Sequence, residues 1–365
     1  MNAHLFFPEN DLALALDLEH YTAPPAAVRL RRAGQPLPLW YGADGDCFVA
    51  SGVNASWLDG VRNTFGIDID VFDYRPGAWA PAPWGWSKAS RLVFRNLGFS
   101  ADRLPDDDAL DAVRLLSHRR TAARVAEELK ARTGIGTAAV EIFSISELLD
   151  YLSTTPDAVV KLPWSSSGRG LVALRCEPAE GQISQIEGMI RRQGSVMAEP
   201  RYDKTLDFAM LFTMEGGRCR PAGLSVFETS GIGIYTANIL VPQQELADMV
   251  AQKTGREAFD TVAAALPGIL EDVIGTAYDG PLGVDMLATS DGEIVPVVEL
   301  NLRMTMGHLC ARFYDRFVSP GAVGRFAVGA GRADDSFEAR NCRISAGHLN
   351  LVPPGGAFTF AVDLR

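Results

Sequence analysis

The sequence contains few of the residues that build disulfide frameworks or zinc sites. Its 365 residues include only five cysteines, an odd number, and no two of them form a Cys-x-x-Cys pair. The five histidines are equally scattered, and no His-x-x-x-His pair could hold a metal on one helix face. We therefore expect buried or idle thiols, and neither a disulfide framework nor a zinc site.

Long hydrophobic runs and a surplus of basic residues are also missing. No run of about 18 apolar residues occurs, and the first residues do not resemble a signal peptide. We therefore expect a cytoplasmic protein without membrane contact. The 45 acidic residues outnumber the 34 basic ones, giving a formal charge of -11, which argues against a broad surface for DNA or RNA. Any nucleotide site must therefore be local.

The composition is that of a globular protein. Hydrophobic residues make up 47% of the chain and charged residues 22%, so we expect the whole chain to fold, as two or three packed lobes. Residues 74–86 contain three prolines and three tryptophans, and prolines exclude a regular helix or a central strand. We expect a loop there, whose rings either line a substrate cleft or pin the loop to the core.

Two acidic residues and an asparagine flank a predicted hairpin turn at 290–292. Side chains alternate along a strand, so Glu299 and Asn301 share one face. A two-residue turn would place Asp285 on the opposite face, whereas one bulged residue at Pro296 or a three-residue turn would restore a common face. Two carboxylates and an amide oxygen are ligands that suit Mg²⁺. The alternative is an ordinary hairpin with solvated acids.

A lysine at the end of a predicted strand precedes a turn rich in serine and glycine. Lys161 and the peptide groups of residues 165–170 could contact phosphates. The turn is neither a Walker loop nor a dinucleotide fingerprint, because it lacks Gly-Lys-Ser/Thr and a third glycine. In isolation, the turn is more typical of a polar hairpin tip than of a phosphate site.

The order of these parts, over about residues 116–310, resembles the ATP-grasp family. The resemblance implies an α/β (α+β) fold in which two subdomains grip ATP. The domains expected from it are an N-terminal α/β domain (1–110), an ATP-grasp domain (111–330, divided near 200 into nucleotide-gripping and metal-binding subdomains), and a C-terminal extension packed on the core (331–365).

The resemblance also implies roles for individual residues. The phosphates would be covered by Lys161, Ser165, Ser166, Ser167, Gly168 and Gly170. The adenine hinge would be Glu199, Pro200, Arg201 and Tyr202, and the acid that holds the ribose would be Asp207. Mg²⁺, with Mn²⁺ as an alternative, would be bound by Asp285, Glu299 and Asn301. Arg303 would face the transferred phosphoryl group, and Lys161 and Arg303 would be the catalytic residues.

Three positions depart from the family pattern. Gly283 stands where D-alanine:D-alanine ligase has an arginine, and Leu302 stands where proline is common. An earlier lysine that contacts phosphates in many members is absent, and Arg119 or Arg120 is the nearest candidate to replace it.

The resemblance implies an ATP-dependent ligase that joins a small-molecule carboxylate to an amine through an acylphosphate, with a homodimer as one expected form. Two alternatives remain open. One is a kinase-like or carboxylating phosphotransferase on the same fold, and the other is a non-catalytic nucleotide-binding module.

Overall fold

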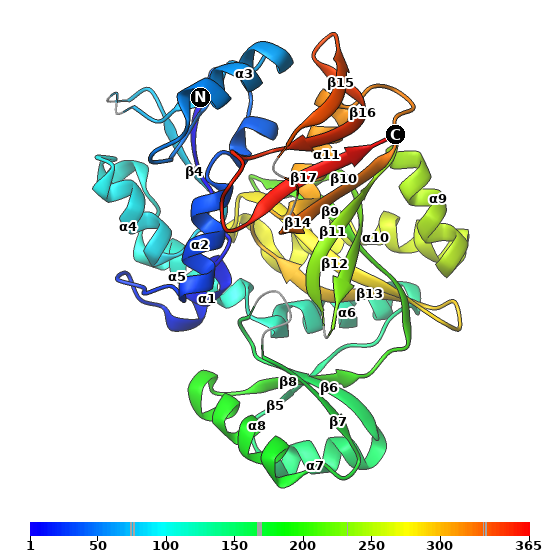
Figure 1. Ribbon diagram of the computed structural model, residues 1–365. Helices are drawn as coiled ribbons and strands as arrows, with labels where there is room; N and C mark the ends of the chain where they lie inside the picture. Colours follow the sequence, from blue (N-terminus) through cyan, green and yellow to red (C-terminus); the bar gives the residue numbers. More distant parts are fainter. Residues whose placement is uncertain (74, 76, 166–169, 232, 331, 333) are drawn as a thin grey trace.

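The computed structural model describes residues 1–365 except 74, 76, 166–169, 232, 331 and 333. Three sheets organise the described chain, and helices cover them (Figure 1). None of the helices in the described part has the length and hydrophobicity needed to cross a bilayer.

The N-terminal sheet has four parallel strands in the order β3-β2-β1-β4. Its strands are β1 (Asn2–Leu5), β2 (Cys47–Phe48), β3 (Asp70–Val71) and β4 (Ala80–Pro83). The surrounding helices are α1 (Asn10–Leu16), α2 (Pro25–Gly34), α3 (Ala55–Phe65) and α4 (Lys88–Asn96), with short 3₁₀ turns at Leu37–Trp40 and Ala101–Arg103. The prediction of a loop throughout residues 74–86 is wrong at Ala80–Pro83. This segment pairs at the sheet edge, where prolines are tolerated.

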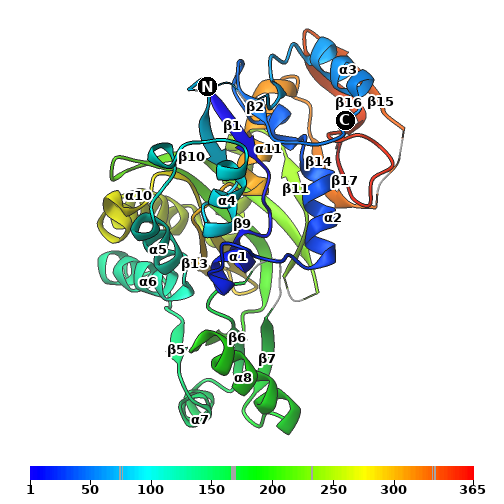
Figure 2. The ribbon, with the colours of Figure 1, turned by 90° about the vertical axis from the view of Figure 1, so that its left-hand side faces the viewer.

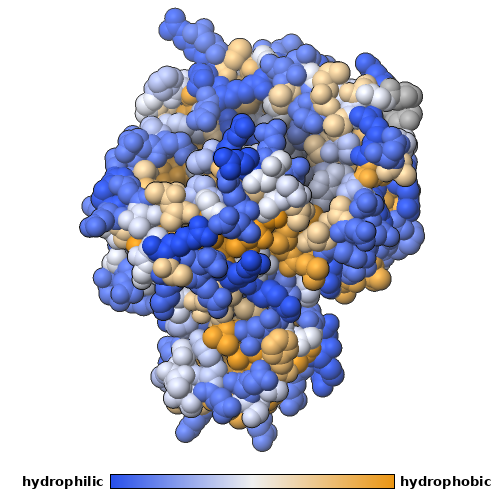
Figure 3. Space-filling model, turned by 180° about the vertical axis from the view of Figure 1, so that it is seen from behind, coloured by the Kyte–Doolittle hydropathy of each residue, from blue (hydrophilic) through white to orange (hydrophobic). Residues whose placement is uncertain are grey.

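A second sheet forms a small lobe below the main body (Figure 1). Its strand order is β5-β8-β6-β7, built from β5 (Val140–Ile142), β6 (Asp157–Lys161), β7 (Leu171–Arg175) and β8 (Val196–Pro200). Helices α7 (Ile145–Thr154) and α8 (Glu180–Gln193) cover this sheet, and α5 (Asp107–Leu116) and α6 (Arg119–Thr133) lead into the lobe. The lobe has its own hydrophobic core. Seen from behind, it projects below the body and is narrower than the body (Figure 3).

The body is built on a nine-stranded sheet with the order β13-β12-β9-β10-β11-β14-β17-β16-β15. Its strands are β9 (Lys204–Glu215), β10 (Arg218–Ser230), β11 (Ile234–Leu240), β12 (Gly280–Thr289), β13 (Ile294–Asn301), β14 (Gly324–Gly329), β15 (Ser336–Arg340), β16 (Arg343–Asn350) and β17 (Thr359–Leu364). The helices attached to it are α9 (Gln243–Thr254), α10 (Arg256–Ile274) and α11 (Met306–Phe317), with a 3₁₀ turn at Gly275–Ala277.

Two hydrophobic cores fix this body. Apolar side chains from α6, α9 and α10 pack on β9, β10, β12 and β13. A separate core joins the N-terminal sheet to α11 and the C-terminal strands, and Trp40 lies fully buried in it. The N-terminal sheet and the last strands of the chain therefore share one core, although the predicted boundaries at 110 and 330 remain predictions.

The close approach of β15 and β16 generates a prediction about stability. Gly347 has a φ of +103°, and a Cβ atom there would lie 2.1 Å from the Ser336 carbonyl oxygen. We expect Gly347→Ala to destabilise the protein by about 2 kcal/mol or more, through backbone strain and overlap. Gly188→Ala is the matched control, because that Cβ would meet nothing closer than 3.6 Å. Alanine within helix α8 should stabilise by about 0.5–1 kcal/mol.

Thermal melting of the whole protein checks this pair of substitutions. The Gly347→Ala variant should melt several degrees below the wild-type protein, and Gly188→Ala should melt at or above it. Equal melting temperatures for the two variants would contradict the described pairing of β15 with β16.

Candidate functional site

The predicted metal ligands lie on neighbouring strands and face each other. Asp285 on β12 pairs directly with Glu299 on β13, and Gly283 pairs with Asn301. The hairpin has a three-residue turn, because Ala288 pairs with Ile294 and Thr289 N donates to Glu293 O at 3.0 Å. A three-residue turn was one of the two predicted ways to bring both acids to one face.

The irregularity predicted near Pro296 is also present, although its size differs from the prediction. Between the pairs Asp285–Glu299 and Leu287–Val295, one residue of β12 lies against three residues of β13. The prediction of a single bulged residue is therefore wrong. Two extra residues shift the register without changing the face, and they move Glu299 from a diagonal position to one directly opposite Asp285.

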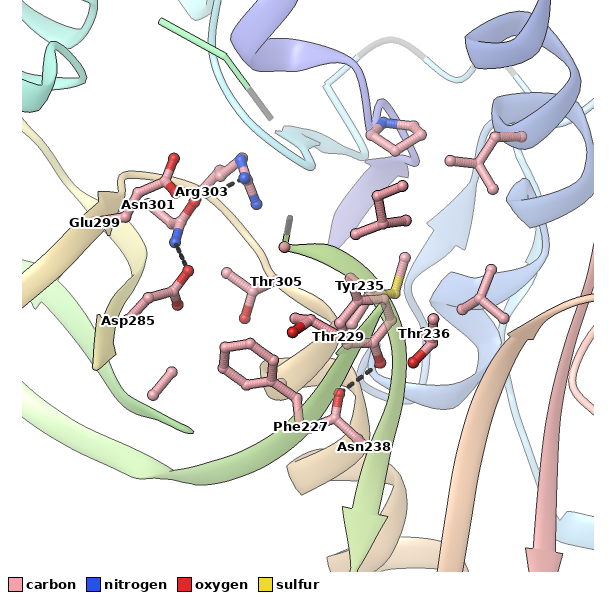
Figure 4. A pocket seen from close by; sticks show the side chains of 18 of the residues that line it. Phe227, Thr229, Tyr235, Thr236, Asn238, Asp285, Glu299, Asn301, Arg303 and Thr305 are labelled. Carbon is pink, nitrogen blue, oxygen red and sulfur yellow. Dashed lines mark hydrogen bonds between the residues drawn. The ribbon is translucent and has the colours of Figure 1, made fainter. Parts of the chain in front are cut away.

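A chain of hydrogen bonds runs from Asp285 through Asn301 to Arg303 (Figure 4). Asn301 Nδ2 donates to Asp285 Oδ2 at 3.0 Å, and Arg303 Nη2 donates to Asn301 Oδ1 at 2.7 Å. The amide oxygen of Asn301 therefore faces Arg303 in this conformation. It could face a metal between the acids only if the amide rotates and releases Arg303.

Burial and a neighbouring charge perturb one of the two acids. Desolvation, and then repulsion from Glu299, raise the pKa of Asp285 to about 7, and the attraction of Arg303 opposes this rise. A carboxyl group in this position holds its proton near neutral pH unless a further positive charge is present. The site is therefore prepared to accept a cation.

Arg119 connects the small lobe to the acids of the body. Its guanidinium donates from Nη2 to Glu299 Oε1 at 2.7 Å and from Nη1 to Leu162 O at 2.6 Å and Ser165 Oγ at 2.8 Å. Arg120 instead contacts Glu141 and is half exposed. Of the two arginines considered from the sequence, Arg119 is the one that lies in the site, and it places a buried positive charge between the turn and Glu299.

Lys161 lies on the small lobe and pairs with a hinge residue. Its Nζ atom is 2.5 Å from Glu199 Oε1, and both side chains are largely buried. Gly170 O accepts from Leu162 N at 3.0 Å, which closes the base of the turn. The predicted phosphate contacts Ser166, Ser167 and Gly168 lie outside the described residues.

The predicted hinge begins at Glu199 and lies at the exit from the small lobe. Pro200 ends β8 opposite Ala158, and Arg201 N donates to Asp157 O at 3.0 Å. Burial, together with the charge of Glu199, raises the pKa of Tyr202 to about 12, so this phenol stays neutral. The hinge therefore offers a neutral aromatic ring beside the pair formed by Lys161 and Glu199.

Asp207, the predicted ribose acid, is the fourth residue of the long strand β9 beyond the hinge. Its Oδ2 atom lies 2.6 Å from Lys204 Nζ and accepts from Thr229 Oγ1 at 2.7 Å. Lys204 also donates to Thr229 Oγ1 at 2.8 Å. Asp207 is therefore already paired within its own strand and the adjacent β10.

The N-terminal domain supplies contacts to the site that the sequence did not reveal. Arg303 Nε and Nη2 both donate to the Asp11 carboxylate, at 3.0 and 2.7 Å to Oδ2. Trp84 O accepts from Met304 N at 2.7 Å. Asp11 lies on a short helix in a region without a motif, so no local pattern could have identified it. The segment after Asn301 is therefore held by the N-terminal residues Asp11 and Trp84 as well as by the nine-stranded body.

A pocket of about 470 Å³ opens beside the acids, between the N-terminal helices and the body. Asp285, Asn301 and Thr305 lie on one side of it, while Tyr235 and Asn238 lie across from them (Figure 4). The rest of its wall is mainly apolar and includes Leu12, Leu30, Trp84, Phe227, Ile234 and Phe358. Trp84 both lines the pocket and is buried, so the two roles considered for the tryptophans coincide at this residue.

The donor set limits which cation the acids could hold. Within the described ranges, no group of three or more His, Cys, Asp or Glu side chains is arranged to bind a metal. Asp285 and Glu299 supply oxygen atoms alone, which suits a hard cation that keeps water or phosphate among its ligands. The residues therefore fit Mg²⁺ bound together with a nucleotide.

Comparisons with known proteins give matches in structure and none in sequence. No family model matches this sequence, and no curated protein matches it. Biotin carboxylase from Campylobacter jejuni, solved as a β-γ-ATP complex, matches with a TM-score of 0.55 at 10% identity, over 100% of this chain and 87% of that chain.

Two further structures match over the whole chain. One is the biotin carboxylase domain of 2-oxoglutarate carboxylase from Hydrogenobacter thermophilus, in complex with MgADP, ADP and bicarbonate (TM-score 0.50, 11% identity, 85% of that chain covered). The other is N5-carboxyaminoimidazole ribonucleotide synthetase from Thermus thermophilus (TM-score 0.50, 15% identity, 94% of that chain covered).

Likeness at such low identity shows the fold. The match includes the N-terminal sheet, the small lobe and the nine-stranded body, because it extends over the entire chain. The fold predicted from the motif order is confirmed, and this chain has the ATP-grasp fold.

Proposed function

We propose that this protein is an ATP- and Mg²⁺-dependent ligase that joins a carboxylate to an amine. The observation that carries the proposal is the direct pairing of Asp285 with Glu299, between two largely buried arginines and beside a mainly apolar pocket. Such an arrangement places oxygen ligands and positive charge where phosphate would be transferred, with room for an acceptor next to it.

ATP would lie between the small lobe and the body. Lys161 offers a point charge to the phosphates, and Glu199 to Tyr202 border the space for the base. Asp207 would hold the ribose after release from Lys204 and Thr229. Nucleotide binding would have to separate Lys161 from Glu199, because the two groups are paired at 2.5 Å. Mn²⁺ could replace Mg²⁺ between the same acids.

A metal held by Asp285 and Glu299 would neutralise charge on the phosphates and orient them. Arg119 and Arg303 would stabilise the negative charge that develops on the transferred phosphoryl group. Both arginines contact residues of the metal site, Arg119 through Glu299 and Arg303 through Asn301. They could therefore replace the arginine that is absent at Gly283.

The reaction would proceed in two displacements. A carboxylate oxygen attacks the terminal phosphorus of ATP, the bond to ADP breaks, and an acylphosphate forms. The amine then attacks the acyl carbon, phosphate leaves with its bonding electron pair, and the amine loses a proton. Catalysis of this kind rests on alignment of the substrates and neutralisation of the phosphate charge, so no protein nucleophile is required.

The residues that line the pocket limit the chemical class of amine that could bind there as the acceptor. Among its described lining residues, Arg303 is the single Lys or Arg, and Asp11 already pairs with it. The wall opposite the acids combines apolar side chains of α1, α2 and β11 with the uncharged polar groups of Tyr235, Thr236 and Asn238. We therefore expect an amine with an apolar body rather than a second strongly anionic group inside this pocket.

Replacing Glu299 tests the proposal. Glu299→Ala should reduce Mg²⁺-dependent ADP release by about 100-fold or more, because a charge that stabilises the transition state is lost with the metal ligand. ADP release is measured with panels of carboxylic acids, including bicarbonate, and amines. Glu293→Gln is the control, since this exposed acid precedes the same strand.

Two outcomes would contradict the proposal. Full turnover in the Glu299→Ala variant would remove the acids from the reaction. Tight ATP binding by the wild-type protein, without ADP release for any acid and amine, would favour the non-catalytic module instead.

The raised pKa of Asp285 predicts a pH-dependent affinity for metal. A cation binds the carboxylate form, and this form becomes more populated as the pH rises through about 7. The Mn²⁺ affinity of the protein should therefore increase by about tenfold between pH 6 and pH 8. Electron paramagnetic resonance of free Mn²⁺ measures this affinity directly.

Two variants complete the pH experiment. Asp285→Asn should bind Mn²⁺ weakly at both pH values, whereas Glu293→Gln should behave as the wild type does. An affinity that does not change with pH in the wild-type protein would show that Asp285 is ionised throughout this range.

A further inference from the structure

A second cavity, of about 370 Å³, lies on another side of α2 from the pocket beside the acids. Its walls come from the second half of α2, from residues 51–53, and from the loop that joins β16 to β17. This loop lies beside α2 in both ribbon views (Figures 1 and 2). The cavity contains none of the residues proposed for catalysis.

Two arginines give this cavity its charge. Arg29 and Arg32 are three residues apart on α2, a spacing that places both on one face of a helix. In the described part of the chain, neither guanidinium has an ion pair or a hydrogen bond, and no Asp or Glu lines the cavity. Arg31, between them, points elsewhere: it pairs with Glu9 at 2.7 Å and lies over the Phe7 ring.

The other residues that line the cavity are mostly small, and none of them is charged. Ser51, Gly52 and Gly355 contribute a hydroxyl and peptide groups, and Cβ atoms built on the two glycines would meet nothing within 4 Å. Peptide N–H groups without a covering side chain can donate to an anion. Guanidinium groups bind carboxylate or phosphate oxygens with paired hydrogen bonds.

We propose that Arg29 and Arg32 form an anion-binding site, which takes a phosphate or carboxylate group. A protein with a net charge of -11 has many acids that could have neutralised these arginines, yet none does. The dipole of α2 explains a basic residue only in the last turn, where Arg32 lies, and does not explain Arg29. This inference does not depend on the proposed ligase activity.

The position of the site suggests two sources for the anion. Ala27 and Leu30 of α2 line the pocket beside the acids, while Arg29 and Arg32 line the second cavity. Phe358 lines the first cavity and its neighbour Ala357 lines the second. The anion has two possible sources. It is either a charged group on an amine acceptor long enough to reach from the pocket beside the acids past α2 to the second cavity, or a separate small molecule.

Calorimetric titration with inorganic phosphate tests the site. The full-length protein is saturated with MgADP and titrated at constant ionic strength. Phosphate should bind saturably, and the Arg29→Gln/Arg32→Gln variant should bind at least about tenfold more weakly. Arg191→Gln/Arg192→Gln is the matched control, because it removes two exposed arginines from the last turn of α8, and its affinity should stay within about twofold of the wild type.

The result that would overturn the proposal is equal phosphate binding by the wild-type protein and the Arg29→Gln/Arg32→Gln variant, or no saturable binding by the wild type. Circular dichroism and melting temperature establish that the variant is folded, as expected for exposed positions. A purely structural role of the arginines would lower the melting temperature without changing the affinity for phosphate.

A kinetic measurement separates the two sources. Amines with and without an attached phosphate or carboxylate are compared as acceptors. If the Arg29→Gln/Arg32→Gln variant has a higher KM than the wild type only for the amines that carry a phosphate or carboxylate, the anion is part of the acceptor. Unchanged KM values, together with weakened phosphate binding, identify a separate anion. Absence of ADP release with every amine would contradict the proposed ligase and leave the phosphate titration unaffected.

Discussion

The site depends on two carboxylates that face each other across adjacent strands in a largely buried position. The charges of Asp285 and Glu299 repel, and burial removes the water that would screen them. The protein offsets this cost with guanidinium groups on either side, Arg119 next to Glu299 and Arg303 close to Asp285 through Asn301. A bound cation would remove the remaining repulsion.

This constraint also explains how the three parts of the chain meet. Arg119 is anchored by Leu162 and Ser165 of the small lobe, so a charge needed by the acids comes from the part that would hold the phosphates. Arg303 is anchored by Asp11 of the N-terminal domain. The positions of the small lobe and of the N-terminal helices are therefore both linked electrostatically to the same pair of acids.

Much of this site could be predicted from local patterns. Strand alternation requires either a three-residue turn at 290–292 or a bulge near Pro296 for the acids to share a face. The three-residue turn occurs, and the irregularity near Pro296 is larger than the single residue predicted. The size of the shift could not be predicted, because it depends on how Pro296 packs; a Cβ atom built on Gly136 would lie 3.0 Å from its ring. The order of the motifs predicted the fold, since each motif occupies a fixed place in it.

Contacts between distant segments could not be predicted in this way. Asp11 and Trp84 reach the site only because the N-terminal sheet packs against α11 and the last strands, and no spacing in the sequence reports that packing. The strand at Ala80–Pro83 was missed for a related reason. Prolines exclude a central strand, and only the assembled sheet shows that this segment is at an edge.

The most direct test of the account is a crystal structure with Mg²⁺ and a non-hydrolysable ATP analogue. We expect a metal at about 2.0–2.1 Å from oxygen atoms of both Asp285 and Glu299. The phosphates should contact this metal and Lys161, with the Lys161–Glu199 pair opened. A nucleotide bound elsewhere, or one whose metal does not touch either acid, would contradict the central claim.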